Sequence, residues 1–216
     1  MSNPKLTLTF DNGPTPGVTE GVLDTLADLD ITALFFLVGQ DLLKPGRRHI
    51  AERAHQAGHR IGNHTMTHSV QLGSSDDPTV VHREIDEAQQ VLGDLTDGDK
   101  LYRPWGNGVL NEQLLSAAAV RQLEDGGYTL ALWNCVPLDW VNPKSWPAAA
   151  LTDIAKQDWT VLVLHDNESG SMAALPEFLS AALEGGIEIR RDLPLECTPI
   201  VRGKRVGSLA GLVPRL

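Results

Sequence analysis

Two histidines four positions apart, His64 and His68, are the residues of this chain best suited to bind a metal ion. If the segment between them makes one helical turn, both imidazoles lie on one face, and imidazole is a common zinc ligand. The HExxH motif of zinc proteases is excluded, because Thr65 occupies the position of its glutamate. Taken alone, this spacing is more typical of two surface histidines, so other residues must support a metal site.

Three further residues could provide acid–base chemistry. Asp11 could act as a general base if its neighbours adjust its pKa, although an Asx-turn before Gly13 and Pro14 would also use an aspartate. Arg103 could orient a catalytic carboxylate or form a structural ion pair. His165 could transfer a proton or simply end a strand. Each of the three, taken singly, fits the structural role slightly better.

These residues belong to polar clusters that follow predicted strands. In a parallel sheet with helical crossovers, the active site forms at the carboxyl ends of the strands. One polar cluster there would mean little, since loops are polar in general. Here five clusters occupy such positions, at residues 11–12, 63–68, 103–106, 139–140 and 165–166. We therefore expect them to converge in one cleft.

Hydrophobic periodicity predicts the elements that must position these clusters. Alternation with period two indicates a strand at residues 6–10, and a continuous apolar run indicates a buried strand at 32–38. Further strands are expected near Ile61 and at 100–103, 128–133, 160–164 and 187–189. Helices are expected at 19–29, before Gly58, and at 78–95, 111–123 with Asn111 as its cap, 147–157 and 172–183. The residues after Pro194 show no assignable pattern.

This alternation predicts an α/β fold, namely a distorted (β/α) barrel of about seven parallel strands. The length of 216 residues fits a single domain spanning residues 1–216. Cys135 and Cys197 lie far apart, which is more typical of buried thiols than of a disulfide or a metal pair. Nothing in the sequence indicates the oligomeric state.

Charge and hydropathy exclude several partners. The net charge is −10 and no basic run occurs, which argues against a nucleic-acid partner. No apolar run is long enough to cross a membrane. The first residues lead directly into a predicted strand and show no secretory signal, so we expect a cytoplasmic protein, with a mature secreted form whose signal has been removed as the alternative.

The ordered set of motifs resembles that of the polysaccharide deacetylases, the NodB-homology proteins of carbohydrate esterase family 4. Residues 9–14, TFDNGP, resemble the first motif, TFDDGP, and residues 63–68, NHTMTH, resemble the second. Residues 103–106, RPWG, are similar to the third motif, with one proline missing. Asp139 and Trp140 match the end of the fourth motif, and residues 163–166, VLHD, resemble the fifth. Each motif is weak alone, but all five follow the family's order.

The resemblance implies a NodB-type barrel and a hydrolase that cleaves a non-peptide C–N amide bond, above all by deacetylation of an N-acetylated sugar or oligosaccharide conjugate. It implies that Asp11 is the catalytic base and that Arg103 orients it. It implies that His165 is the general acid, tuned by Asp139. The residues implied to bind substrate are Trp105, Gly106, Trp140 and Val163.

The implied metal site departs from the family at one ligand. The resemblance assigns a divalent metal, usually zinc and cobalt in some members, to His64, His68 and a third residue that is Asn12 here instead of aspartate. A carboxamide oxygen can bind a metal but supplies no charge, so this site should hold metal more weakly. Three interpretations stay open. The protein is a deacetylase with a weakly bound metal, a metal-independent hydrolase of small cyclic amides like imidases and allantoinases, or a catalytically inactive carbohydrate-binding protein.

We rank catalysis above its loss, because the four implied acid–base residues are all present: Asp11, Arg103, Asp139 and His165. A cytoplasmic enzyme would act on an N-acyl sugar, a short oligosaccharide or another small amide. Serine-hydrolase chemistry is disfavoured because the chain has no GxSxG motif, and no phosphate-binding loop occurs.

Overall fold

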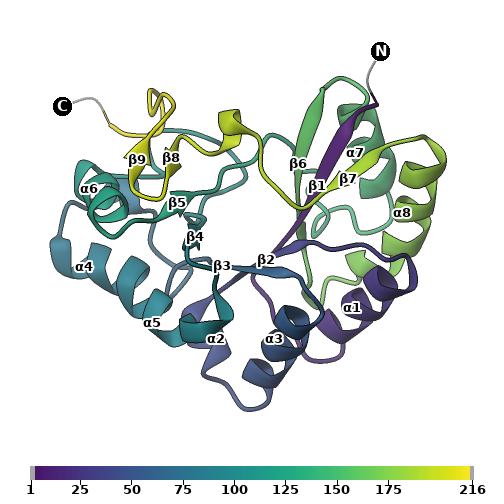
Figure 1. The fold of residues 1–216 in the computed structure, drawn as a ribbon, viewed down its shortest axis with the longest axis horizontal. Coiled ribbons are helices and arrows are strands. Elements are labelled where there is room, and N and C mark those ends of the chain that lie inside the picture. Colours follow the sequence, from purple (N-terminus) through teal and green to yellow (C-terminus); the bar gives the residue numbers. More distant parts are fainter. Residues whose placement is uncertain (1–2, 215–216) are drawn as a thin grey trace.

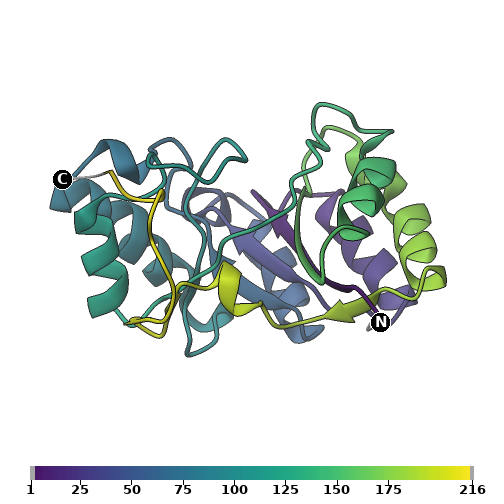
Figure 2. The same ribbon diagram turned by 90° about the horizontal axis from the view of Figure 1, so that it is seen from above.

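The computed structural model describes residues 3–214, which contain a seven-stranded parallel sheet with helices on its outer side (Figures 1 and 2). The strand order is β5-β4-β3-β2-β1-β6, and β7 pairs with β1. The strands are β1 (Lys5–Asp11), β2 (Leu34–Leu37), β3 (Arg60–Asn63), β4 (Leu101–Tyr102), β5 (Thr129–Leu130), β6 (Trp159–His165) and β7 (Glu188–Arg190). This architecture confirms the predicted α/β fold with parallel strands.

The central strand β1 organises the sheet. One edge of β1 pairs with β6 along its whole length, from Lys5 opposite Trp159 to Asp11 opposite His165. The other edge is shared, because β7 pairs with residues 5–7 and β2 pairs with residues 9–11. All five core positions of β1 from Leu6 to Phe10 are fully buried, as expected for a strand covered on both faces.

The sheet curls until its two ends meet. Residues after β5 reach β6, where Cys135 forms a parallel bridge with Leu162. The Cys135 N–H donates to Val161 O at 3.2 Å, and the Val163 N–H donates to Cys135 O at 3.0 Å. This single bridge closes a distorted (β/α) barrel. The predicted barrel class is therefore confirmed.

The helices are shorter and more broken than the periodicity indicated. They are α1 (Thr19–Asp28), α2 (Gly39–Leu42), α3 (Arg47–Gln56), α4 (Pro78–His82), α5 (Ala88–Leu92), α6 (Ala117–Asp125), α7 (Trp146–Ile154) and α8 (Leu175–Glu184). The helix predicted at 78–95 is interrupted between α4 and α5 by a π-helical turn, Arg83–Glu87. In the part of the chain that the structure describes, no helix has the length and apolar character needed to cross a membrane.

Two local predictions were wrong. The helix predicted from Asn111 begins at Ala117, and its cap is Ser116, whose Oγ accepts the Ala119 N–H at 3.2 Å. Asn111 instead accepts the Gln113 N–H at 2.9 Å in a local turn. The strand predicted at 128–133 is reduced to β5, because the following residues bend away to reach β6.

The segment after Pro194 covers β5. It forms a short hairpin of β8 (Ile200–Val201) and β9 (Lys204–Arg205). The Gly203 N–H donates to Tyr128 O at 2.8 Å, and the Leu132 N–H donates to Cys197 O at 2.8 Å. This part of the chain therefore supplies partners for the residues around β5.

Replacing Phe35 would measure how much the core beneath the sheet contributes to the free energy of unfolding. Its ring is 1% exposed and stacks on Phe10, with centroids 5.0 Å apart. Phe35→Ala should lower the free energy of unfolding by about 3–5 kcal/mol, because it removes a fully buried aromatic side chain and leaves a cavity. Urea denaturation would measure this loss, with Leu195→Ala, at a side chain 74% exposed, as the control that should change stability little. A change below about 1 kcal/mol for Phe35→Ala would contradict this packing.

Candidate active site

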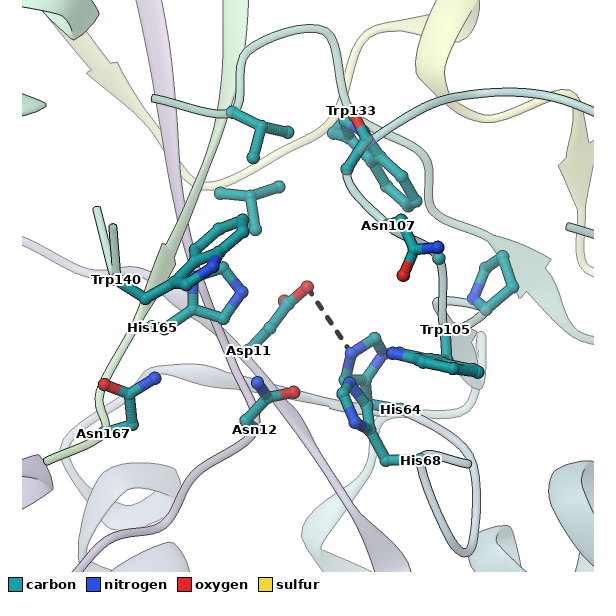
Figure 3. A pocket seen from close by; sticks show the side chains of 15 residues that line it. Asp11, Asn12, His64, His68, Trp105, Asn107, Trp133, Trp140, His165 and Asn167 are labelled. Carbon is teal, nitrogen blue, oxygen red and sulfur yellow. Dashed lines mark hydrogen bonds and ion pairs between the residues drawn. The ribbon is translucent and has the colours of Figure 1, made fainter. Parts of the chain in front are cut away.

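A cavity of about 270 Å³ opens at the carboxyl ends of the strands (Figure 3). Asp11 ends β1 and His165 ends β6, and the two are register partners in adjacent parallel strands. Their side chains therefore point to the same side of the sheet. The cavity is lined by nine of the residues singled out in the sequence: Asp11, Asn12, His64, His68, Trp105, Gly106, Trp140, Val163 and His165.

Arg103 does not line the cavity, but it holds Asp11 from below. It is fully buried, and its Nη1 donates to Asp11 Oδ1 at 2.8 Å and to Thr9 Oγ1 at 2.7 Å. The guanidinium also lies 3.9 Å from the centroid of the Phe36 ring. Burial opposes the charge of Asp11, but the charge and hydrogen bond of Arg103, together with His64 and His165, outweigh it, and the pKa of Asp11 lies below its usual value. Asp11 is therefore ionised at neutral pH.

The two histidines are neutral and face the cavity. His64 Nδ1 lies 2.9 Å from Arg103 O, and because a carbonyl oxygen only accepts, Nδ1 carries the proton. His64 Nε2 is then left with a free lone pair, 3.7 Å from Asp11 Oδ2. Burial lowers the pKa of His64, and burial lowers the pKa of His68 to about 3. Neutral imidazole is the form that binds metal ions.

No helical turn brings the histidines together. Their ring centroids lie 4.9 Å apart, but Thr65 and His68 have left-handed backbone conformations, with φ of 68° and 53°. The loop is held from inside, because Asn63 Oδ1 accepts the Thr65 N–H at 2.9 Å and Thr65 Oγ1 accepts the His68 N–H at 3.0 Å. The two rings lie close together, as the spacing suggested. The helical turn considered for this segment was wrong, because a loop with left-handed residues brings them together.

His165 forms a hydrogen-bonded pair with Asp139. His165 Nδ1 lies 2.8 Å from Asp139 Oδ1, and Asp139 Oδ2 accepts the His165 N–H at 3.1 Å and the Ser171 hydroxyl at 3.0 Å. Burial would lower the pKa of His165, but the hydrogen bond and charge of Asp139 outweigh it, so this pKa is raised. The Trp140 and His165 rings lie edge to face, with their centroids 4.6 Å apart. Asp139 is fully buried and, like Arg103, acts on the cavity through its partner.

The cavity wall includes residues that the sequence did not single out. Trp133 and Val136 add apolar side chains to the lining, and Asn107 and Asn167 add amide groups. Figure 3 shows Trp133, Asn107 and Asn167 around the cavity. Asn167 directly follows the cluster at 165–166, so its position was a usable signal. Gly106 packs closely against the cavity wall, since a Cβ there would lie 2.7 Å from Leu114 Cδ2 and would displace that side chain.

Asp166, in contrast, does not line the cavity. It is fully buried and accepts a hydrogen bond from the Thr19 hydroxyl. A Cβ on Gly13 would lie 2.2 Å from Asp166 Oδ2, so Asp166 packs directly against the turn that follows Asn12. Burial raises the pKa of Asp166 to about 7.

Comparisons with known proteins agree on one family. The sequence profile described as "Polysaccharide deacetylase" matches residues 1–124. A chitooligosaccharide deacetylase of Rhizobium leguminosarum bv. phaseoli is 30% identical over 204 residues, covering 89% of this chain and 83% of the relative. A peptidoglycan-N-acetylglucosamine deacetylase of Bacillus cereus is 29% identical over 189 residues, covering 81% and 79%. The chain belongs to the polysaccharide deacetylase family.

Solved structures support the same fold. A family 4 acetyl xylan esterase from Clostridium thermocellum, in complex with a cobalt ion, superimposes with a TM-score of 0.71 and 24% identity, covering 86% of each chain. Membership of the polysaccharide deacetylase family confirms the predicted resemblance, barrel class and hydrolase activity.

Whether this polysaccharide deacetylase can hold a metal depends on Asn12. Within residues 3–214, no three His, Cys, Asp or Glu side chains are arranged to bind a metal ion. Asn12 Oδ1, however, is buried without a hydrogen-bond partner among these residues, and its amide points toward His64 and His68 (Figure 3). A buried oxygen that lacks a donor is costly unless a cation or water satisfies it. Two neutral imidazoles and this oxygen therefore fit a divalent metal.

Proposed function

We propose that this protein removes an acetyl group from an N-acetylated sugar or oligosaccharide conjugate by hydrolysing its C–N amide bond. The observation that carries the proposal is the register pairing of Asp11 and His165, which sets an ionised carboxylate and an imidazole on one side of the cavity. The names of the relatives, a chitooligosaccharide deacetylase and a peptidoglycan-N-acetylglucosamine deacetylase, support this substrate class. We also propose that residues 1–216 act as one catalytic domain.

In the proposed reaction, Arg103 holds Asp11 in place, and Asp11 accepts a proton from the attacking water. The water oxygen bonds to the carbonyl carbon of the acetyl group. His165, whose Nδ1 is engaged by Asp139, gives the proton on Nε2 to the amide nitrogen, and the C–N bond breaks. Acetate and a free amine leave the site. The base, Asp11, thus lies at the end of β1, and the acid, His165, lies at the end of the neighbouring strand β6.

The proposed metal ligands are Asn12, His64 and His68. They would hold a divalent ion such as zinc, which supplies Lewis-acid polarisation of the amide carbonyl when bound. Trp105, Gly106, Trp140 and Val163 would enclose the acetyl group and the adjoining sugar ring. The cytoplasmic location stays a prediction.

The pH dependence of kcat/KM tests the acid–base assignment. Activity needs Asp11 ionised and His165 protonated, so it should fall in acid as Asp11 gains a proton and in alkali as His165 loses one. Asp139 raises the pKa of His165, so Asp139→Asn should move the alkaline limb to lower pH by about 1–3 units and leave the acid limb in place. An alkaline limb unchanged in Asp139→Asn would exclude His165 as the acid.

A product screen tests the function itself. Purified protein would be incubated with zinc and with N-acetylated chito-oligosaccharides, N-acetylglucosamine conjugates and cyclic imides, while acetate and amine release are measured. We expect acetate release from at least one N-acetylated sugar and its loss on chelation. Ring opening of an imide that survives chelation would favour the metal-independent hydrolase instead. Ligand-induced thermal stabilisation without any product would favour an inactive binding protein.

A further inference from the structure

The π-helical turn Arg83–Glu87 contacts the loop that carries His64 and His68, residues 63–68, at two points. We call this segment the histidine loop. Before His64, the Asn63 Nδ2 donates to Ile85 O at 2.8 Å. Before His68, the Thr67 N–H donates to Glu84 Oε2 and the Thr67 hydroxyl donates to Glu84 Oε1, both at 2.9 Å. Single π-turns within helices frequently occur at functional sites. One irregular turn therefore contacts the residue that precedes each histidine.

Glu84 is an unusual residue to find in this position. Its carboxylate is 0% exposed, and Arg83, its cationic partner, binds Oε1 at 2.9 Å from a side chain that is 42% exposed. Burying a carboxylate costs free energy that an apolar side chain would not, so a buried ion pair is weak evidence for a role in stability. The contacts that the buried Glu84 carboxylate does make orient Thr67.

The histidine loop needs such an external hold. Thr65, a β-branched residue, has a φ of 68°, and His68 has a φ of 53°, conformations that non-glycine residues adopt only when the surroundings enforce them. The Gly39 N–H donates to Thr65 O at 3.0 Å from the other side of the loop. Loss of the Glu84 contacts would loosen the chain before His68, whose own N–H is still held by Thr65 Oγ1, while His64 stays fixed through Arg103 O.

We propose that Glu84 is a positioning residue for the metal site, acting through Thr67 to aim His68 at the point that His64 and Asn12 also face. The inference rests on the proposed metal site. It predicts that loss of the Glu84 carboxylate weakens metal binding although Glu84 does not touch the metal. Outer contacts that orient ligands typically change metal affinity by about 10- to 100-fold.

Asp86 provides a matched control on the same π-turn. Its carboxylate accepts hydrogen bonds from Tyr128 OH at 2.8 Å and Gln122 Nε2 at 2.6 Å, and its Oδ2 lies 2.8 Å from His82 Nδ1. It therefore contacts α4, α6 and the residue before β5 instead of the histidine loop. Glu84→Gln and Asp86→Asn each remove one carboxylate charge from this turn. A general loosening of the turn would affect both variants alike, whereas a positioning role would affect only the first.

The experiment is a zinc titration of the metal-stripped wild type, Glu84→Gln and Asp86→Asn, with the visible absorption of the cobalt-loaded proteins as a second readout. We expect Glu84→Gln to bind zinc about 10- to 100-fold more weakly and to change the cobalt spectrum. Asp86→Asn should retain wild-type zinc affinity and spectrum. If Glu84→Gln fails to fold, Thr67→Ala should bind zinc about tenfold more weakly than Thr67→Ser, which keeps the hydroxyl.

Three results would overturn the inference, each for a different reason. If the wild type binds zinc and Glu84→Gln binds it equally well, the positioning role is wrong while the proposed function stands. Equal weakening by Asp86→Asn would also overturn it, because the effect would then belong to the turn as a whole. A wild type that binds no zinc would overturn the proposed metal site and this inference together.

Discussion

Asp11→Asn and His165→Ala should each lower kcat by roughly two to four orders of magnitude on the true substrate, the range for loss of a general base or acid. Asp11→Asn is the better variant at this position, because an amide oxygen can still accept the hydrogen bond from Arg103 Nη1. Asp11→Ala would leave the Arg103 charge buried and unpaired, which destabilises proteins by about 3–5 kcal/mol. Acetate release under saturating substrate would measure both variants.

Folding and metal content serve as controls for this result. Circular dichroism and thermal unfolding should show both variants folded, and zinc affinity should change little for His165→Ala, because His165 lies across the cavity from the histidine pair (Figure 3). Full activity in either folded variant would remove that residue from the mechanism. A raised KM with kcat preserved would assign the substituted residue to substrate binding instead.

Asn12→Asp should tighten zinc binding by at least about 10- to 100-fold, because a charged oxygen ligand replaces a dipole while His64 and His68 stay in place. The unsatisfied Asn12 Oδ1 marks the position that the new carboxylate would occupy. The new charge would also lie next to Asp11, and a bound cation would relieve the repulsion between the two carboxylates. Zinc titration of the two proteins, with acetate release in parallel, gives the comparison.

The outcome of this substitution separates three accounts of the site. Tighter binding with faster amide hydrolysis supports a deacetylase whose metal is weakened by Asn12. Tighter binding with unchanged or slower hydrolysis indicates chemistry that no longer depends on the metal. If Asn12→Asp binds zinc no better than the wild type, His64 and His68 do not form a metal site.

The predictable parts of the fold were those with long, regular patterns. The strand at residues 6–10 and the apolar run at 32–38 correspond to β1 and β2, and the run at 160–164 corresponds to β6. Strands β4 and β5 are only two residues long, so hydrophobic periodicity defines their ends poorly. Asn111 misled the helix assignment, because Asx-turns and helix caps use the same side chain and the same kind of backbone contact.

The site was predictable through its motifs more than through its local structure. Contacts such as Arg103 with Asp11, 92 positions apart, leave no trace in hydropathy and came only from the family resemblance. The left-handed Thr65 and the π-turn that carries Glu84 depend on tertiary contacts, so neither follows from the residues of the loop alone. The catalytic and ligand roles of the individual residues stay predictions.

The most direct test is a zinc titration of metal-stripped wild-type protein while acetate release from an N-acetylated chito-oligosaccharide is followed. We expect negligible activity without metal, a rise on addition of zinc, and saturation at about one zinc per chain, as expected for a single site with three protein ligands. Full turnover by the metal-free protein, with no change on adding zinc, would contradict it.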